Sequence, residues 1–321
     1  STDTCGIESL VLDITAFNCS NVGENTVTLI ATDVNGNVAS KTASVTVKDV
    51  TAPIVNTNNI SIDLDVNGQI SISPEMIDND SSDACGIETL VLDITSFDCS
   101  NVGENTVVLT ATDVNGNMAS QTATVTVNDV TAPVVLTKDL SIDLDANGNA
   151  TITPDLINNG STDACGVATL VLDTTSFDCS NVGENTVNLT VKDVNGNVAS
   201  QSATVTINDA TAPTVITQSF SMDLANGVVN ITPSDIDGGS FDNCEFTLSI
   251  DKDRFTCDDI GDHVVTLTAT DASGNTSSNT AIVSVIGDVP TISINNFYAV
   301  QTQKKNTIFL GFGPQNINLS T

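Results

Sequence analysis

The eight cysteines of this chain carry its clearest chemistry, because cysteine sulfurs form disulfides or bind soft metals. They occur as four pairs that recur at intervals of about 80 residues. His263 is the single histidine, so the pairs cannot supply four soft ligands for zinc. We therefore expect one disulfide inside each repeat and an oxidising compartment. The four expected bridges are Cys5–Cys19, Cys85–Cys99, Cys165–Cys179 and Cys244–Cys257.

The second chemical feature is a set of acidic side chains that recur at fixed offsets. With 40 acidic against 8 basic residues the formal net charge is −32, and this repulsion excludes nucleic acid and anionic membranes as partners. Carboxylate and amide oxygens are the hard ligands that Ca²⁺ takes, six to eight at a time. In a seven-stranded sandwich, the acids of the repeat junction and of two turns should share one end, facing a glutamate turn of the preceding domain. The candidate inter-repeat Ca²⁺ ligands are Asp49, Asp129, Asp209, Asp113, Asp193, Asn115, Asn195, Asp65, Asp145, Glu104 and Glu184.

A second interpretation of these acids needs no metal. Asp and Asn are favoured in turns because they hydrogen-bond their own backbone and tolerate left-handed geometry. The stretch that starts at Asp113 also imitates an EF-hand loop, but its twelfth position is Thr124 where that loop requires Glu. Structural Ca²⁺ and turn formation both remain open at this point.

Catalysis has little support in the sequence, and we expect no catalytic residue and no bound organic cofactor. Asp63 and Asp65 could suggest a glycosidase pair, but the same pair returns at Asp143 and Asp145 in a small domain that predicts no cleft. An enzyme rarely needs one site several times over. The chain also lacks a run of 18 apolar residues, so we expect no direct membrane insertion.

The amino-acid sequence between the cysteines repeats as well, and this repetition defines the domain organisation. Asn21-Val-Gly-Glu-Asn-Thr-Val27 returns unchanged at Asn101 and Asn181, and a period of about 80 residues predicts a tandem array of small β domains. Because Ser1 to Cys5 aligns with Ser161 to Cys165, we expect the chain to begin about 32 residues inside a repeat. The expected domains are 1–49 (the C-terminal part of a repeat), 50–129, 130–209, 210–288 (divergent) and 289–321 (the start of a different β domain, with strands near 306–310 and 316–319).

One repeat illustrates the elements that position these residues. Residues 140–144 and 150–153 alternate apolar with polar side chains around an Asn-Gly turn, which predicts a hairpin. Thr153 and Pro154 predict one helical turn over 153–157. Residues 167–172, 186–192 and 199–207 read as strands, the last two joined by a second hairpin turn at 193–197, with a further extended stretch around Phe177. Six or seven short strands predict an all-β, two-sheet sandwich of immunoglobulin type in each repeat.

The repeat resembles a known family. The stretch from Val102 to Asn117, with Asp129-Val-Thr-Ala-Pro133 after it, resembles hyalin-type (HYR-like) immunoglobulin-fold repeats, in particular those of large secreted surface proteins of Bacteroidota such as the gliding adhesins. The tail from Asn306 to Gln315 is similar to segments that follow such repeats there. The resemblance implies type IX secretion and a long surface filament. Many hyalin repeats carry a cysteine after the Gly-Asn pair where this chain has Met118-Ala-Ser120, so their disulfide pairing is not transferred.

These observations favour a non-enzymatic stalk or spacer segment of an extracellular cell-surface adhesin or filament that serves attachment or gliding motility. Its expected partners are a surface or polysaccharide, bound by parts outside this fragment, and the secretion and outer-membrane anchoring machinery. Two other functions stay open: a multivalent calcium-dependent carbohydrate-binding module, and an accessory region of a large secreted hydrolase. Aromatics make up 3% of the chain, which disfavours a carbohydrate-binding groove.

Overall fold

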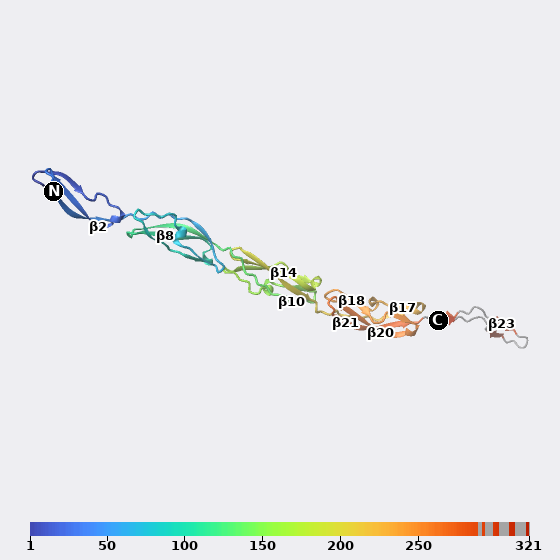
Figure 1. The fold of residues 1–321 in the computed structure, drawn as a ribbon. Helices are drawn as coiled ribbons and strands as arrows, with labels where there is room; N and C mark the ends of the chain where they lie inside the picture. The colour runs from blue at the N-terminus through green and yellow to red at the C-terminus, as the bar shows by residue number, and fades with distance from the viewer. Residues whose placement is uncertain (288–290, 293–297, 302–307, 312–318, 321) are drawn as a thin grey trace. The chain divides into compact units, whose positions relative to one another are not determined.

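The computed structural model describes residues 1–287, 291–292, 298–301, 308–311 and 319–320. The chain, coloured in Figure 1 from blue at the N-terminus to red at the C-terminus, divides into two compact units. The first comprises Ser1–Leu136, Gly160–Val171 and Thr190–Gln201, and the second comprises Thr137–Asn159, Leu172–Leu189 and Ser202–Thr321. The division runs through the third repeat, so that its two ends belong to different units.

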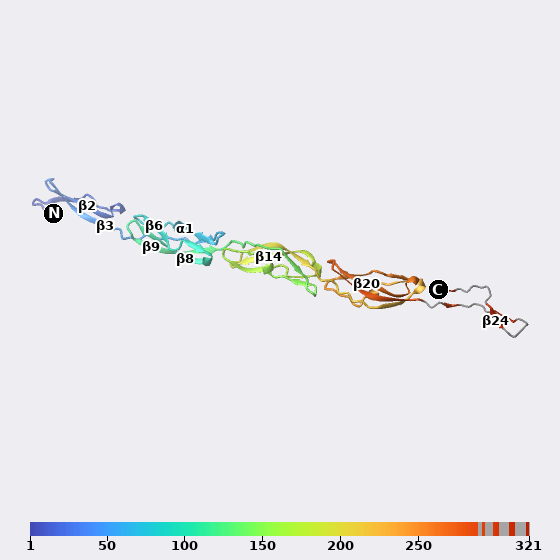
Figure 2. The same cartoon turned by 90° about the horizontal axis from the view of Figure 1, so that it is seen from below.

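The repeat at 50–129 lies in the first unit and contains six strands in two sheets. One sheet has the order β4-β9-β8-β6, and β5 pairs with β7 in the second sheet. β4 runs parallel to β9, whereas β9, β8 and β6 are antiparallel neighbours, and Figure 2 shows them side by side. This arrangement confirms the predicted all-β sandwich. The elements are β4 (Ile60–Asp63), β5 (Gln69–Ser71), α1 (Pro74–Ile77), β6 (Ile87–Leu92), β7 (Ser96–Asp98), η2 (Cys99–Asn101), β8 (Gly103–Asp113) and β9 (Met118–Asn128).

The core of this repeat follows from period-two alternation along its two long strands. In β8 the side chains of Val107, Leu109 and Ala111 are fully buried, while the residues between them face outward. Phe97 on β7 supplies the large apolar side chain that closes the core from the second sheet and is 3% exposed. Because the core has no Trp and few aromatics, packing depends on Val, Ile, Leu and Ala.

The first unit also holds the partial repeat at 1–49. Its strands form one sheet with the order β1-β2-β3. They correspond to the C-terminal strands of a complete repeat, as the aligned sequence predicts. The elements are β1 (Ile7–Leu12), η1 (Cys19–Asn21), β2 (Gly23–Asp33) and β3 (Val38–Val47).

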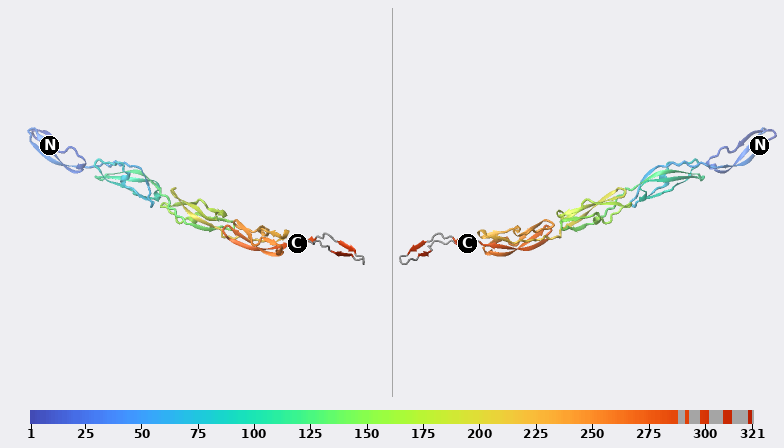
Figure 3. Two further views of the ribbon diagram at one scale, coloured as in Figure 1. Left: turned by 45° about the vertical axis from the view of Figure 1, so that its right-hand side comes forward. Right: turned by 180° about the vertical axis from the view of Figure 1, so that it is seen from behind.

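The third and fourth repeats have the same sheet orders, β10-β15-β14-β12 with β11-β13, and β16-β21-β20-β18 with β17-β19. The long strands of the fourth repeat are orange in Figure 3. The third repeat contains β10 (Leu140–Asp143), β11 (Asn149–Thr151), α2 (Pro154–Ile157), β12 (Val167–Leu172), β13 (Ser176–Asp178), η3 (Cys179–Asn181), β14 (Gly183–Asp193) and β15 (Val198–Asn208). The fourth contains β16 (Phe220–Asp223), η4 (Ala225–Gly227), β17 (Val228–Asn230), α3 (Pro233–Ile236), β18 (Phe246–Ile250), β19 (Arg254–Thr256), η5 (Cys257–Asp259), β20 (Gly261–Asp271) and β21 (Thr276–Ile286).

One predicted hairpin is confirmed and the other is wrong. The predicted turn at 193–197 joins β14 to β15, its neighbour in the sheet, and Asp193 N–H donates to the carbonyl of Asn197. The Asn-Gly turn at 145–149 also closes, with Asp145 N–H donating to the carbonyl of Asn149. However, its flanking strands enter different sheets, since β10 pairs with β15 and β11 pairs with β13. The turn therefore connects the two layers. The predicted helical turn at 153–157 is present as α2.

In the C-terminal region the described strands are β22 (Thr291–Ile292), β23 (Tyr298–Gln301), β24 (Ile308–Gly311) and β25 (Leu319–Ser320). β23 pairs with β24, and β22 pairs with β25. β24 overlaps the strand predicted near 306–310. The predicted strand at 316–319 lies outside the described residues except for Leu319.

The predicted disulfide pairing is wrong: Cys5–Cys19, Cys85–Cys99, Cys165–Cys179 and Cys244–Cys257 do not form. Each bridge instead joins the second cysteine of one repeat to the first cysteine of the next, as Cys19–Cys85, Cys99–Cys165 and Cys179–Cys244. The reason is the length of the strand between the paired positions. A six-residue strand spans about 20 Å, whereas bridged Cα atoms lie within about 7 Å, so β6 holds Cys85 and Cys99 at opposite ends of their repeat. Cys5 and Cys257 are unpaired and exposed.

Candidate functional site: bridged joints with carboxylate clusters

Each joint between repeats is built around its disulfide. In the first unit, Cys99 and Cys165 have Cα atoms 5.1 Å apart, and the turn at 65–68 of the preceding repeat lies against them. Gly68 in this turn has a φ of +73°, and a Cβ there would lie 2.6 Å from Cys99 Sγ. Both the backbone geometry and the close approach of the sulfur therefore require glycine. Gly148 repeats this arrangement in the second unit, where a Cβ would lie 2.6 Å from the Asn243 carbonyl oxygen.

Beside the bridges, acidic side chains gather in the following repeat. In each group the potential ligand atoms all lie within 4.8 Å of one another. Two groups combine two aspartates with a bridged cysteine, and the third consists of three aspartates. The groups are Asp49, Asp83 and Cys85; Asp129, Asp163 and Cys165; and Asp209, Asp242 and Asp271.

The three-aspartate group lies within the second unit and draws its members from three separate segments. Asp209 comes from the repeat junction and Asp271 from the end of β20, and they are 7% and 6% exposed. Asp242 precedes Cys244 in the loop before β18. Asn275 fixes the junction to the turn, because its Nδ2 donates to the Asp209 carbonyl at 2.9 Å and to Asp271 Oδ2 at 2.8 Å. Two carboxylates at such separations repel by roughly 3–4 kcal/mol at an effective dielectric constant of about 20.

Asp242 is the member of this cluster whose buried carboxylate has no hydrogen-bond partner of normal geometry. Both of its carboxylate oxygens are shielded from solvent, and neither accepts a hydrogen bond of normal geometry. Burial raises the pKa of Asp242, and the charges of Asp209 and Asp271 raise it further, while the nearby amides of Asn243 and Cys244 offset this only in part. The Oδ1 of Asn243 is also buried and without a partner, while its Nδ2 donates to the Asp145 carbonyl and to Asp209 Oδ1, both at 3.3 Å.

Each of the other two clusters also contains a buried carboxylate oxygen without a hydrogen-bond partner, but one oxygen instead of two. Asp129 is 8% exposed; its Oδ1 accepts from Thr131 N–H and Oγ1, but its Oδ2 is buried and unpartnered. Asp49 Oδ2 is likewise buried without a partner. Asp83 and Asp163 each accept the N–H of the cysteine two residues on.

The turn aspartates of the predicted ligand set behave as the turn interpretation expects. Asp113 and Asp193 are buried, and each accepts backbone and side-chain hydrogen bonds from the Asn four residues on. Burial acts to raise the pKa of each carboxyl, but these hydrogen bonds outweigh it and lower the pKa below its usual value. For Asp65 and Asp145 the pKa is lowered by backbone N–H groups of their own turns.

The prediction that all these acids share one end of a domain is wrong for the turns at Asp65 and Asp145. The Asp65 turn lies against Cys165 of the next repeat, whereas the junction Asp49 groups with Cys85, which belongs to the same repeat as the Asp65 turn. The Asp65 turn, whose flanking strands β4 and β5 enter different sheets, therefore lies near the acidic cluster of the next repeat and not near the cluster of its own repeat. Among the described residues, the predicted ligands Glu104 and Glu184 belong to none of these clusters. Asn115 and Asn195 each donate the backbone N–H to the aspartate of their own turn.

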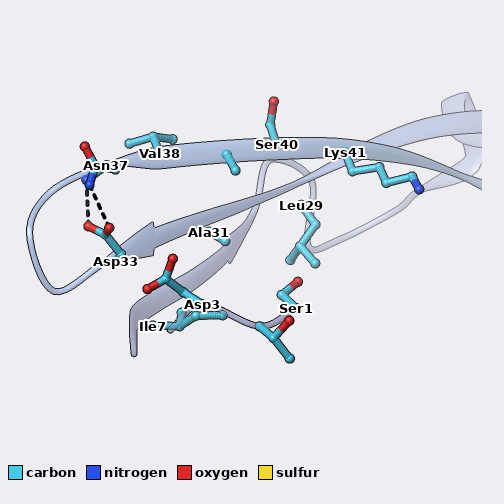
Figure 4. Close-up of a pocket in the computed structure, with 12 residues that line it drawn as sticks. Ser1, Asp3, Ile7, Leu29, Ala31, Asp33, Asn37, Val38, Ser40 and Lys41 are labelled. Carbon is cyan, nitrogen blue, oxygen red and sulfur yellow. Dashed lines mark hydrogen bonds between the residues drawn. The ribbon is translucent and has the colours of Figure 1, made fainter. Parts of the chain in front are cut away.

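The sequence-based ligand set omitted Asp83, Asp163 and Asp242, which lie at the centre of the clusters. A signal for them exists, since each stands two residues before the first cysteine of its repeat. Their role emerged only in three dimensions, where the cysteine loop folds against the junction and the hairpin turn. In the partial repeat the equivalent pair, Asp3 and Asp33, lines one pocket with Asn37, as Figure 4 shows.

That pocket is the inner face of the three-stranded sheet. Leu29 and Ala31 line it, and their counterparts Leu109 and Ala111 are fully buried in the complete repeat. The pocket has a volume of about 360 Å³.

The single histidine, His263, contacts a backbone carbonyl and an aromatic ring. His263 Nε2 lies 2.7 Å from the Asp259 carbonyl oxygen, and its ring packs at 5.5 Å on the ring of the buried Phe255.

Parts of known proteins are similar to this chain in sequence. No protein-family model matches the chain. Hyalin from the sea urchin Strongylocentrotus purpuratus is 31% identical over 286 residues, which cover 83% of this chain and 23% of that protein. Hyalin from Lytechinus variegatus is 29% identical over 307 residues, 86% of this chain and 55% of that protein. The chain is similar to hyalin. It spans between a quarter and about half of the length of these relatives.

Solved structures of tandem β domains are similar only in part. The extracellular cadherin domains 1–4 of protocadherin gamma B7 match with a TM-score of 0.30 and 15% identity, covering 83% of this chain and 84% of theirs. Domains EC1–4 of Drosophila N-cadherin match with a TM-score of 0.31 and 11% identity, covering 90% and 94%. The assignment of the fold rests on the sheet orders above.

The disulfides indicate a repeat protein of an oxidising, extracellular type of compartment. Among the described residues there is no helix of the length and apolarity that a membrane span requires.

Proposed function

We propose that this chain is a non-enzymatic spacer of a cell-surface adhesin or filament, in which disulfides carry tension from one repeat to the next. The observation that carries the proposal is the pairing of cysteines across every repeat joint in the described chain. A bridge inside a domain would protect that domain alone. A bridge between neighbours lets force pass from repeat to repeat through covalent bonds.

The covalent path explains why such small domains suit this role. Force that enters at Cys85 leaves its repeat at Cys99, so the tension runs along β6 and β7. Each bridge joins cysteines with a sequence separation of 66 and bypasses the segment between them, which is Cys19 to Cys85 for one bridge and Cys99 to Cys165 for the next. The bypassed segments contain most of the thin aliphatic core of each repeat, while Leu92 and Phe97 lie on the loaded strands. A domain of about 80 residues buries only about 60–65% of its unfolded surface and is marginally stable. The bridges thus relieve the weakest part of the structure of mechanical load.

The finer features of the proposal come from the sequence. A bacterial surface filament that serves gliding or attachment, exported by the type IX route, fits the resemblance of the repeats. Contact with a surface or polysaccharide is assigned to parts of the protein outside this fragment, as is the outer-membrane anchor. In this proposal the acidic joints also hold structural Ca²⁺, with a ligand set that differs from the one predicted.

The proposal is tested by holding the oxidised chain at a constant pulling force in an optical trap, attached at its two ends. The oxidised chain should stay short at forces that unfold the reduced chain completely. A parallel assay measures binding of the same chain to polysaccharide-coated and bare surfaces. If oxidised and reduced chains extend equally, tension does not pass through the bridges and the spacer role is wrong.

A further inference from the structure

The three-aspartate cluster of the second unit combines concentrated negative charge with buried oxygens that have no partner. Asp209 and Asp271 are more than nine-tenths buried, and their potential ligand atoms lie within 4.8 Å of a carboxylate oxygen of Asp242. Neither Asp242 oxygen reaches solvent or a hydrogen-bond donor of normal geometry. Buried polar atoms in folded proteins are nearly always partnered, so unpartnered carboxylate oxygens in this position indicate a missing positive group.

No described side chain of the protein supplies that positive group. Among the described residues the recorded ion pair is Lys252–Asp259, which involves none of the three aspartates. Turn chemistry also fails to account for Asp242. Asp271 is occupied by Asn275 of its own turn, and Asp209 accepts from Thr211 N–H. The amides of Asn243 and Cys244 lie near Asp242 but leave both of its oxygens without a hydrogen bond of normal geometry.

A difference between the repeats adds a further oxygen at the same place. Asn243 stands between the aspartate and the cysteine where the two preceding repeats have Ala84 and Ala164. Its Nδ2 is held by Asp209 Oδ1 and by the Asp145 carbonyl of the preceding repeat, which leaves its Oδ1 buried and unpartnered beside Asp242. Unpartnered oxygens from two adjacent side chains thus accompany two buried carboxylates.

We propose that Asp209, Asp242, Asp271 and the Oδ1 of Asn243 bind one Ca²⁺ at the joint between the third and fourth repeats. All of these ligands are hard oxygens, and they come from three separate segments. Ca²⁺ accepts six to eight oxygens in adaptable geometry, whereas Mg²⁺ demands near-ideal octahedral geometry and gives up its waters reluctantly. Bound Ca²⁺ would tie the junction, the cysteine loop and the hairpin turn together, and Asn243 would link them to the turn of the preceding repeat. This inference rests on the calcium part of the proposed function and names the ligands at one joint; the path of tension through the disulfides can hold or fail without it.

The test measures Ca²⁺ binding to the full oxidised chain by equilibrium dialysis against Ca²⁺ alone, over the range of about 10⁻⁴ to 10⁻³ M typical of extracellular sites. Wild type is compared with Asp242→Asn, which keeps the shape and removes one charge. Glu245→Gln is the matched control, since it removes the same charge from an exposed side chain three residues away. We expect Asp242→Asn to bind about one Ca²⁺ fewer per chain than wild type and Glu245→Gln.

A second variant, Asn243→Ala, restores the residue that the preceding repeats carry and is therefore compatible with the fold. It should weaken this site several-fold and leave the other bound ions unchanged. Melting temperatures separate a metal role from a structural one. In chelator, Asp242→Asn should melt at or above the wild-type temperature because it relieves repulsion, and in Ca²⁺ it should melt below wild type. Equal Ca²⁺ binding by wild type and Asp242→Asn, or no binding by either, would overturn the site. Equal binding of Mg²⁺ would overturn the choice of Ca²⁺.

Discussion

Pulling the chain from its ends separates the observed disulfide pairing from the pairing expected within each repeat. The perturbation is the removal of one bridge, by the double substitution Cys99→Ser and Cys165→Ser. In the observed pairing this bridge removes 66 residues from the covalent path. A fully extended chain spans about 3.3–3.6 Å per residue, so loss of the bridge should add about 220–240 Å to the maximum extension.

The alternative pairing gives a very different length. With pairing inside each repeat, the same double substitution would break Cys85–Cys99 and Cys165–Cys179, which each remove only 14 residues, and would add about 90–100 Å. The assay is single-molecule force spectroscopy of the oxidised protein at forces that extend every accessible segment. Substitution of Cys5 and Cys257 by serine is the control, because both are unpaired and their loss should leave the extension unchanged.

Three outcomes of this measurement are distinct. The longer increment supports the bridged joints. The shorter increment would show that the cysteines pair within repeats and would refute the reasoning. No increment at all would show that this pair is not bridged in the folded protein.

Three further results are expected. Gly68→Ala should destabilise the joint by more than the ~1–2 kcal/mol of a left-handed residue alone, because its Cβ meets a sulfur at 2.6 Å; chemical unfolding measures this. Phe97→Ala should lower the free energy of unfolding by about 3–5 kcal/mol, since the ring is 3% exposed in an aliphatic core. The hydrogen bond from Lys252 lowers the pKa of Asp259 to about 2. The stability from this pair is therefore fully present above pH ~4 and is lost as the pH falls through 2.

Each of these results has a matched control. Gly116→Ala has the same left-handed backbone with no heavy atom within 4 Å, so equal losses for both glycines would remove the sulfur contact as a cause. Phe241→Ala alters a ring that is 57% exposed and should cost little; a loss equal to that of Phe97→Ala would contradict the assignment of the core. In an NMR titration of carboxyl carbons, Lys252→Met should move the Asp259 pKa up toward 3.8, and an unchanged pKa would exclude the lysine as its cause.

Much of each repeat was predictable because its signals are local. The alternation along Val107, Leu109 and Ala111 sets which face of β8 is buried, and Asp193 with its Asn-Gly turn closes the following hairpin. The similar Asn-Gly turn at 145–149 was misassigned because local turn chemistry does not say which strands pair beyond it. β10 finds its partner β15 far along the chain, at the other end of the repeat, and that choice depends on how the two layers assemble.

For the candidate site, the sequence predicted the residue types but not which of them lie together. The recurrence of aspartate, asparagine and cysteine predicted oxygen ligands and disulfides. Asp209 at the junction lies in a carboxylate cluster, and its role as a Ca²⁺ ligand stays a prediction. Glu104 and Glu184 belong to none of the described clusters, and Asp242 was absent from the predicted set because its neighbours come from segments distant in the sequence.

The sequence by itself determined the repeat length, the strand content, the aliphatic core and the number of cysteines available for bridges. These follow from residue type and from two periodicities, the alternation along each strand and the recurrence of the whole repeat, which any stretch of the chain displays. Only the tertiary structure decided which cysteines meet. β6 carries Cys85 and Cys99 to opposite ends of one repeat, and each cysteine is left next to a neighbouring repeat rather than next to its partner in sequence.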